Sequence, residues 1–254
     1  MLKGHTSLKN IASQLNISTL TAFDWRHKIL ASLNTPDYQL SGLVELIQSE
    51  FPFNRKGIGV SNARELNKDL PKPPVSMIMA ADYNADNSFA AGILRIGNWT
   101  VPEIVDYVNL HVHPDSVIIS PASNSMVAVK QTGKFGLTVF SKKQNPHKLN
   151  VKKSSKFDSD FKKLIFSKTR GVSSKYLHLY ANWAAFLIAN HNKENTQNII
   201  SRSLTNHFAW AEFTNRENKY KLFLQNHSEV PYIKTCNRKW ETAEIRPIMK
   251  ELLY

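Results

Sequence analysis

The sequence predicts an α/β protein with an N-terminal helix-turn-helix followed by a mixed β-sheet and flanking helices. Two observations predict this class. Between Ser7 and Ile29 the apolar residues recur at the spacing of two short helices. From Leu43 onward, short apolar runs alternate with amphipathic segments in the order expected for strands and helices. The chain has 254 residues, which is long enough for one substantial core and a small additional module.

The composition favours a polyanionic partner. Lys and Arg total 33 against 20 Asp and Glu, which gives a formal net charge of +13. Cationic side chains laid against phosphates release counterions, so DNA is the leading partner and an anionic membrane surface comes second. The single cysteine, Cys236, excludes an internal disulfide and a cysteine-based zinc site, and it fits a cytoplasmic location. Because no apolar run reaches about 18 residues, we expect no spanning helix.

The front of the chain is typical of a helix-turn-helix. One face of its first predicted helix carries Leu8, Ile11, Ala12 and Leu15. Ser7 is placed to cap this helix. Asn16 follows it at the point where the turn needs a left-handed backbone, which asparagine tolerates better than most residues. We expect Ile17 to fill the corner between the two helices.

The second predicted helix carries residue types that meet DNA. We expect Ser18 or Thr19 to cap it. Its inward face is expected to consist of Ala22, Trp25 and Ile29. Its free side chains, which we predict to bind DNA, are Thr19, Thr21, Arg26 and Lys28. In this motif such side chains lie in the major groove and meet base edges and phosphates. The alternative is a helical hairpin that only packs on the next domain.

After Pro36 the pattern alternates between strands and helices. The predicted strands cover 43–53, 74–81, 89–96, 116–119 and 137–140. A helix is expected after Thr100, because Glu103 has the spacing of a capping box, and further helices are expected at 125–131 and 176–189. This order predicts a mixed sheet covered by helices. It is compatible with an RNase H-like core and with many other α/β domains.

The most basic part of the chain lies between Lys142 and Lys175. Its cationic residues are Lys142, Lys143, Lys148, Lys152, Lys153, Lys156, Lys162, Lys163, Lys168, Arg170 and Lys175. Only Asp158 and Asp160 oppose them, so the like charges repel one another unless an anion is bound. We predict a contact with the DNA backbone, and the alternative is a solvated helix face. The lysines expected to make this contact are Lys152, Lys153, Lys162, Lys163 and Lys175.

Other candidate chemistry is sparse. His111 and His113 have a spacing that suits a metal on a strand, but imidazoles are common near a helix C-terminus because the helix dipole favours positive charge there. We therefore assign no metal to them. Cys236 has no local catalytic motif around it. Beyond His191 we expect a set of aromatic residues to pack rather than to stack on unpaired bases. These are Phe208, Trp210, Phe213, Tyr220, Phe223, Tyr232 and Trp240.

Four segments together resemble the ISXO-like insertion-sequence transposases. They are SLKNIASQLNISTLTAFDWRHKILASL, LSGLVELIQSEFPFNRKG, DSVIISPAS and RGVSSKYLHLYANW. The first and last are the most specific, because TAFDWRHKIL and GVSSKYL are long, ungapped and in the expected order. The resemblance extends from about Ser7 to about Trp183. Relatives usually carry a cysteine-rich zinc ribbon before the helix-turn-helix, and this chain starts almost inside the latter.

The resemblance implies an RNase H-like nuclease fold in which two aspartates and a third Asn or Glu hold magnesium for strand cleavage and joining. The matching positions do not supply these ligands. The first aspartate falls on Ile47 and the second on Pro121. The third position falls on Lys156 when it is counted back from the segment GVSSKYL, and on Lys152 when it is counted forward from His147. An ammonium group at this place disfavours a divalent cation.

Several carboxylates lie near these positions and are candidate ligands for a pair of metal ions displaced from the site that the resemblance implies. They are Glu45, Glu50, Asp82, Asp115, Asp158 and Asp160. Strand alternation places Glu45 on the same face as Ile47 and Glu50 on the opposite face, so Glu45 is the better candidate. The alternative, which we favour, is that these are surface carboxylates balancing a basic protein.

The sequence divides into a helix-turn-helix at 1–36, a degraded RNase H-like core at 37–190 and a C-terminal extension at 191–254. We expect a DNA-binding, transposase-like protein of an insertion element without strand-transfer activity. It needs no cofactor, its partner is DNA and not a membrane, and a homo-oligomer is compatible with the sequence. Two alternatives stay open. One is an active Mg²⁺-dependent transposase or nuclease that uses displaced carboxylates, and the other is a decayed insertion-element product with no selected role.

Overall fold

A mixed five-stranded sheet forms the centre of the protein. The computed structural model describes residues 7–33, 39–54, 74–83, 88–121, 123, 126, 136–140, 150–169, 171–189, 197 and 199–201. The strands are β1 (Leu43–Pro52), β2 (Pro74–Asp82), β3 (Phe89–Ile96), β4 (Val117–Pro121) and β5 (Gly136–Phe140). Their order across the sheet is β3-β2-β1-β4-β5. The predicted mixed α/β architecture is therefore confirmed, and each predicted strand is present to within two residues at either end.

Among these five described strands, only β2 runs against the others. β2 pairs in an antiparallel manner with both β1 and β3, whereas β4 is parallel to β1 and to β5. Residues 75–82 of β2 are all buried, which is why this part of the chain is a nearly continuous apolar run. Glu45 lies beside Ala81 on one neighbouring strand and beside Ile119 on the other. The sheet therefore holds Glu45 well inside the protein.

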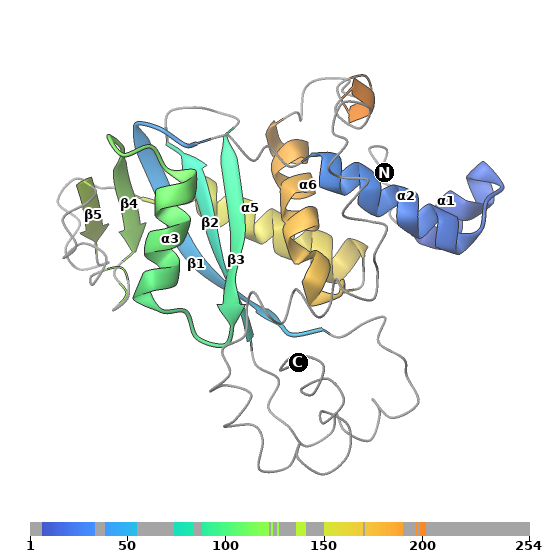
Figure 1. Cartoon of the computed structure of the whole chain (residues 1–254), viewed down its shortest axis with the longest axis horizontal. Helices are drawn as coiled ribbons and strands as arrows, with labels where there is room; N and C mark the ends of the chain where they lie inside the picture. Colours follow the sequence, from blue (N-terminus) through green and yellow to red (C-terminus); the bar gives the residue numbers. More distant parts are fainter. Residues whose placement is uncertain are drawn as a thin grey trace, which may run out of the picture.

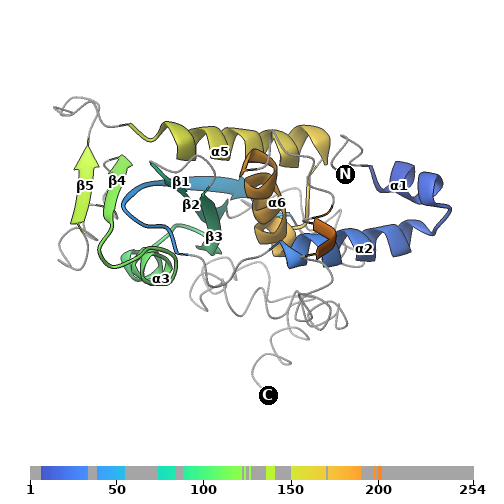
Figure 2. The ribbon, with the colours of Figure 1, turned by 90° about the horizontal axis from the view of Figure 1, so that it is seen from above.

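Helices cover both faces of the sheet. The helix α3 (Val101–His111) lies on one face, and α5 (Lys152–Lys163) and α6 (Leu177–Ala189) lie on the other (Figures 1 and 2). The α3 face encloses Leu46, Ile78, Ile104 and their neighbours. The α5 and α6 face encloses a larger aromatic core that includes Phe51, Phe157, Phe161, Tyr180 and Trp183. The helix predicted at 176–189 is confirmed as α6.

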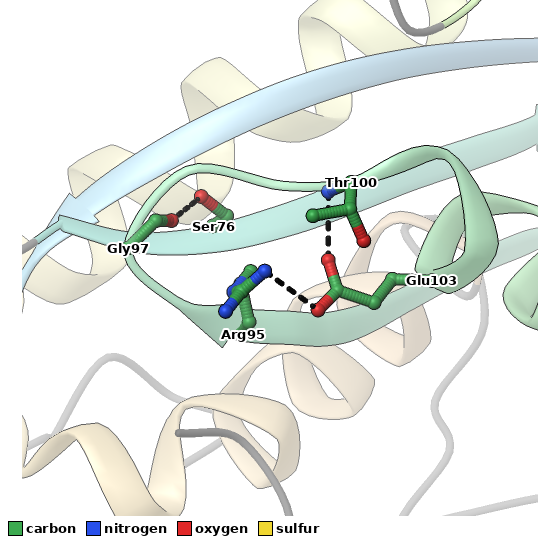
Figure 3. Close-up of polar contacts among 5 residues, drawn as sticks. All are labelled: Ser76, Arg95, Gly97, Thr100 and Glu103. Atoms are coloured by element: carbon green, nitrogen blue, oxygen red, sulfur yellow. Dashed lines mark hydrogen bonds and ion pairs between the residues drawn. The ribbon is translucent and has the colours of Figure 1, made fainter. Parts of the chain in front are cut away.

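The connection from β3 to α3 is fixed by polar contacts (Figure 3). Glu103 Oε2 accepts the Thr100 N–H at 2.7 Å, as the capping-box spacing predicts. The other carboxylate oxygen of Glu103 lies 3.3 Å from the Arg95 guanidinium on β3. Ser76 on β2 donates to the carbonyl of Gly97. These contacts fasten the start of α3 to the end of the sheet.

The two N-terminal helices extend from the rest of the protein. They are α1 (Leu8–Leu15) and α2 (Thr19–Ser32). The C-terminal part of α2 packs beside α6, and α1 with the N-terminal part of α2 lies farther from the sheet (Figures 1 and 2). Among the described helices, none is long and apolar enough to cross a membrane. The predicted helix at 125–131 lies outside the described residues except for Met126, which is helical and buried.

Gly92 on β3 provides the space that the Tyr107 ring occupies. A Cβ atom at position 92 would lie 2.6 and 2.8 Å from two ring carbons of Tyr107. We therefore expect Gly92→Ala to lower the free energy of unfolding by about 1–3 kcal/mol, which is the usual cost of overpacking. Urea denaturation measures this loss. In a Tyr107→Leu background the same change should cost clearly less. An equal cost in both backgrounds would contradict the assigned contact.

Candidate functional site

The turn between α1 and α2 has the geometry that the sequence predicts. Asn16 is left-handed, with φ 51° and ψ 45°, and it is the one non-glycine residue with positive φ among those described. The Ile17 N–H donates to the Ala12 carbonyl at 3.0 Å, which closes the end of α1. Ser18 Oγ accepts the Thr21 N–H at 3.0 Å and lies 2.8 Å from Thr21 Oγ1, which caps α2. The start of α2 is therefore fixed in place.

Ser18 is the capping residue, which resolves the choice between Ser18 and Thr19. Ser7 occupies the N-cap position of α1, but its side chain makes no capping hydrogen bond. Ile17 is half-buried at the corner. Of the two predicted caps, only the one at α2 is therefore made by a side-chain hydrogen bond.

The buried face of α2 differs from the predicted face. Trp25 was expected to point inward but is 57% exposed, and Arg26 was expected to be free but is only 5% exposed. Ala22 is buried as predicted, and Ile29 is half-buried. Of the other residues predicted to be free, Thr19 is exposed, whereas Thr21 and Lys28 are half-buried. The prediction is therefore wrong for Trp25 and Arg26.

An aromatic cluster explains this difference. The Phe23 and His27 rings of α2 lie 5.8 and 4.3 Å from the ring of Tyr176, and His27 also lies 5.8 Å from Tyr180. Arg26 also faces this cluster, because its side chain forms a hydrogen bond with Tyr180. Burial raises the pKa of the Tyr180 hydroxyl, and the charge and hydrogen bond of Arg26 offset part of that rise. Contacts with residues about 150 positions away therefore select the buried face of α2.

The lysines of α5 differ in their exposure and in whether they pair with an acid. Lys152, Lys156 and Lys163 are exposed and recur at a spacing of four and seven residues, which places them on one outward stripe. Lys162 Nζ lies 2.8 Å from Asp158 Oδ2, and Lys163 Nζ lies 3.6 Å from Asp160 Oδ1. Both acids of this segment therefore neutralise lysines that were predicted to contact DNA.

Two further predicted lysines are partly covered. Lys153 and Lys175 are half-buried. The Lys175 ammonium lies 5.0 Å from the centre of the Tyr176 ring, and burial lowers the pKa of this lysine. Lys142, Lys143, Lys148 and Arg170 lie outside the described residues, as do Cys236 and the aromatic residues predicted to pack in the C-terminal extension. The outward stripe of α5 is thus the clearest cationic surface that the structure describes.

The positions expected for metal ligands lie on the α5 side of the sheet without forming a ligand set. Ile47 is part of the aromatic core and only 8% exposed. Pro121 ends β4 and is exposed. Lys152 and Lys156 are both exposed at the start of α5. These residues do not fit a divalent cation, because none offers an oxygen ligand from its side chain.

Glu45 is bonded to α5. It is 1% exposed, and its Oε2 accepts hydrogen bonds from the Ser154 amide at 2.8 Å and the Ser154 hydroxyl at 3.1 Å. Ser154 lies in the first turn of α5, where backbone N–H groups lack helical partners and the helix dipole favours an acid. Glu45 therefore shares the face of Ile47, as predicted, but the expectation of a surface carboxylate is wrong for it. Sequence spacing alone gave no indication of Ser154 as its partner.

The other carboxylates are dispersed. Asp82 lies opposite Val44, so the strand pleat directs it to the face away from Glu45. Glu50 and Asp115 are exposed. Asp158 accepts from the Ser49 hydroxyl at 2.5 Å in addition to pairing with Lys162. Among the residues that the structure describes, no three His, Cys, Asp or Glu side chains form a group that could hold a metal ion.

The two histidines near the end of α3 do not act together. Burial lowers the pKa of His111, whose ring lies 4.5 Å from that of Tyr107. His113 is half exposed, and its Nδ1 lies 3.7 Å from a carboxylate oxygen of Asp115. They therefore have separate environments.

Neither a scan against protein-family models nor a search of curated proteins gave a match for this chain. Function is therefore inferred from the geometry and charge of the described residues.

We expect Glu45→Gln to lower the free energy of unfolding by about 1–2 kcal/mol, because a neutral amide loses the charge-assisted bonds to Ser154 and the attraction to the α5 N-terminus. Thermal and urea unfolding measure this change. The matched control is Glu50→Gln, an exposed acid on the same strand, which should change stability by less than about 0.5 kcal/mol. Equal effects at the two positions would show that the contact with Ser154 contributes little.

Proposed function

We propose that this protein binds duplex DNA through α2 and the cationic stripe of α5, and that it is a transposase-like protein without strand-transfer activity. The observation that carries the proposal is the capped turn from Asn16 to Thr21, which forms the end of α2 that lies farther from the sheet (Figure 2). A helix presented in this way enters the major groove with its first residues nearest the bases. Of the predicted DNA-binding residues on this helix, Thr19 is exposed, and Thr21 and Lys28 are half-buried. The cytoplasmic location expected from the sequence belongs to the same proposal.

The stripe on α5 supports a backbone contact. From Lys152 to Lys163 the helix rises by about 16 Å, which corresponds to about five base-pair steps of a duplex. No acid lies three or four residues from Lys152 in the sequence. Asp160 lies four residues after Lys156, and it pairs with Lys163. Lys162 is a poorer candidate than the sequence predicts, because Asp158 lies 2.8 Å from it. Lys152 and Lys156 are therefore the leading phosphate contacts.

The sheet supports an RNase H-like core as part of this proposal. Among the described residues the sheet has five strands, of which only β2 runs against the others, and helices cover both faces. β1 and β4 are adjacent and parallel, with Glu45 beside Ile119. Strand alternation therefore directs Glu45, Ile47 and Pro121 to the same, α5 side of the sheet. This is the side on which the resemblance to ISXO-like transposases would place the catalytic acids.

The contacts of this side support the loss of strand cleavage. The acid on β1, Glu45, is buried beneath the first turn of α5 and bonded there. Ile47 is packed in the core, and Pro121 lacks a ligand atom in its side chain. A two-metal mechanism needs carboxylates that converge at a surface open to DNA. The enzymatic alternative is weakened because its best candidate acid is enclosed.

The first test is the salt dependence of duplex binding. If about six phosphates are neutralised, log K should fall against log salt with a slope of about −5. Replacing Lys152 and Lys156 by Ala should reduce the steepness by about two, one for each lost phosphate contact, with similar weakening for all sequences. Fluorescence anisotropy on full-length protein at several salt concentrations provides the measurement.

Lys162→Ala is the matched control, because that lysine is on the same helix but is paired with Asp158. It should leave the slope nearly unchanged. A flat titration from low to physiological salt would remove the electrostatic basis for binding. Equal losses for the control and for the Lys152/Lys156 variant would mean that the stripe is misassigned.

The second test is DNA cleavage. With magnesium or manganese we expect neither nicking of supercoiled plasmid nor joining of DNA ends, because oxygen ligands do not converge on the described surface. Agarose gels of timed incubations measure this. Nicking by the natural protein that disappears in Glu45→Gln but not in Glu50→Gln would support the enzymatic alternative instead.

A further inference from the structure

Two serines share the outward stripe of α5 with its lysines. Ser155 and Ser159 are both exposed and are four residues apart. Ser155 is three residues after Lys152, and Ser159 is three residues after Lys156, a spacing that places the members of each pair on one helix face. The helix runs along an outer side of the protein (Figure 2). Each serine therefore shares its face with an exposed ammonium group.

The hydroxyl groups of these two serines are not used inside the protein. Within the part of the chain that the structure describes, neither hydroxyl makes a hydrogen bond. Ser154 differs, because it is buried and its hydroxyl lies 3.1 Å from Glu45 Oε2. Serine inside a helix is less favourable than alanine, since its side chain competes for backbone groups. The hydroxyls of Ser155 and Ser159 are thus surface donors that the helix does not need for its own formation.

Backbone donors at the start of α5 are already occupied. The Ser154 N–H donates to Glu45 at 2.8 Å, and the Ser155 N–H donates to the Val151 carbonyl at 3.0 Å. An anion on the outward stripe is therefore bound by side chains, which are the ammonium groups and the two free hydroxyls.

The charge of the stripe favours a row of phosphates. Neither Lys152 nor Lys156 forms an ion pair among the described residues, whereas Lys163 pairs with Asp160. Phosphate oxygens accept hydrogen bonds from serine hydroxyls as well as from ammonium groups. The donors recur from Lys152 to Lys163 over about 16 Å of helix. A duplex backbone supplies acceptors at regular intervals over such a length.

We propose that Ser155 and Ser159 are phosphate-binding residues, each of which donates its hydroxyl to a backbone phosphate of the duplex that Lys152 and Lys156 hold. The inference rests on the proposed function and makes it more specific. The lysines supply an attraction that depends on salt, and the serines supply directional bonds that fix the position of the phosphates on α5. Both kinds of contact are independent of base sequence.

The experiment measures duplex binding by full-length protein that carries Ser155→Ala and Ser159→Ala together. These changes remove both hydroxyls and preserve the helix, because alanine is the best helix former. We expect Kd to rise by about threefold to tenfold for each lost hydrogen bond. The slope of log K against log salt should stay unchanged, because a neutral side chain releases no counterion. Lys152→Ala should instead make the slope shallower by about one.

The matched control carries Ser155→Thr and Ser159→Thr, which keeps both hydroxyls and should bind the duplex as the natural protein does. The inference is overturned if the alanine variant also binds like the natural protein, because the hydroxyls then face only water. It is equally overturned if the threonine variant loses as much affinity as the alanine variant. Polyglutamate is the second probe: if it binds as tightly as the duplex and loses as much affinity in the alanine variant, the stripe recognises an acidic protein instead. Absence of any binding to duplex DNA would refute the proposed function itself.

Discussion

The packing of α5 along the inner strands of the sheet determines which charged side chains of this helix are buried and which are exposed. At the start of the helix Ser154 donates to Glu45, farther along Asp158 accepts from Ser49, and near the end the Phe161 ring lies 5.0 Å from that of Phe51. Polar bonds and aromatic packing therefore act together over the whole length of the helix. Because one side of α5 packs on β1 in this way, Lys152, Lys156 and Lys163 on the opposite side face outward.

The same packing decides which acids are available. Asp158 is held by Ser49 and Lys162, and Glu45 is held by Ser154, so both carboxylates satisfy groups within the protein. A buried acid without such partners would be costly, whereas one that accepts charge-assisted hydrogen bonds is stable. The arrangement explains how a strongly basic protein keeps an acid in its core.

Much of the fold could be predicted from the sequence because its determinants are local. The apolar run in β2, the Thr100 and Glu103 pair at the start of α3, and Asn16 in the turn each depend on a few neighbouring residues. The orientation of α2 could not be predicted in this way. Its face is chosen by Tyr176 and Tyr180, and hydrophobicity alone pointed to Trp25. The ion pair of Lys162 with Asp158 and the burial of Glu45 against Ser154 were missed for related reasons. A count of charges does not show which acid lies within reach of a lysine or which side chain is enclosed.

The burial of Ile47 limits which side chains position 47 can carry. An aspartate introduced there would lie among the aromatic residues of the core, where an unpaired charge costs several kcal/mol. That is a large part of the stability of an ordinary domain, which is about 5–15 kcal/mol. A single substitution of Ile47 by aspartate would therefore remove much of the stability of the protein before any set of metal ligands was complete. The packing of the core thus restricts position 47 to apolar side chains.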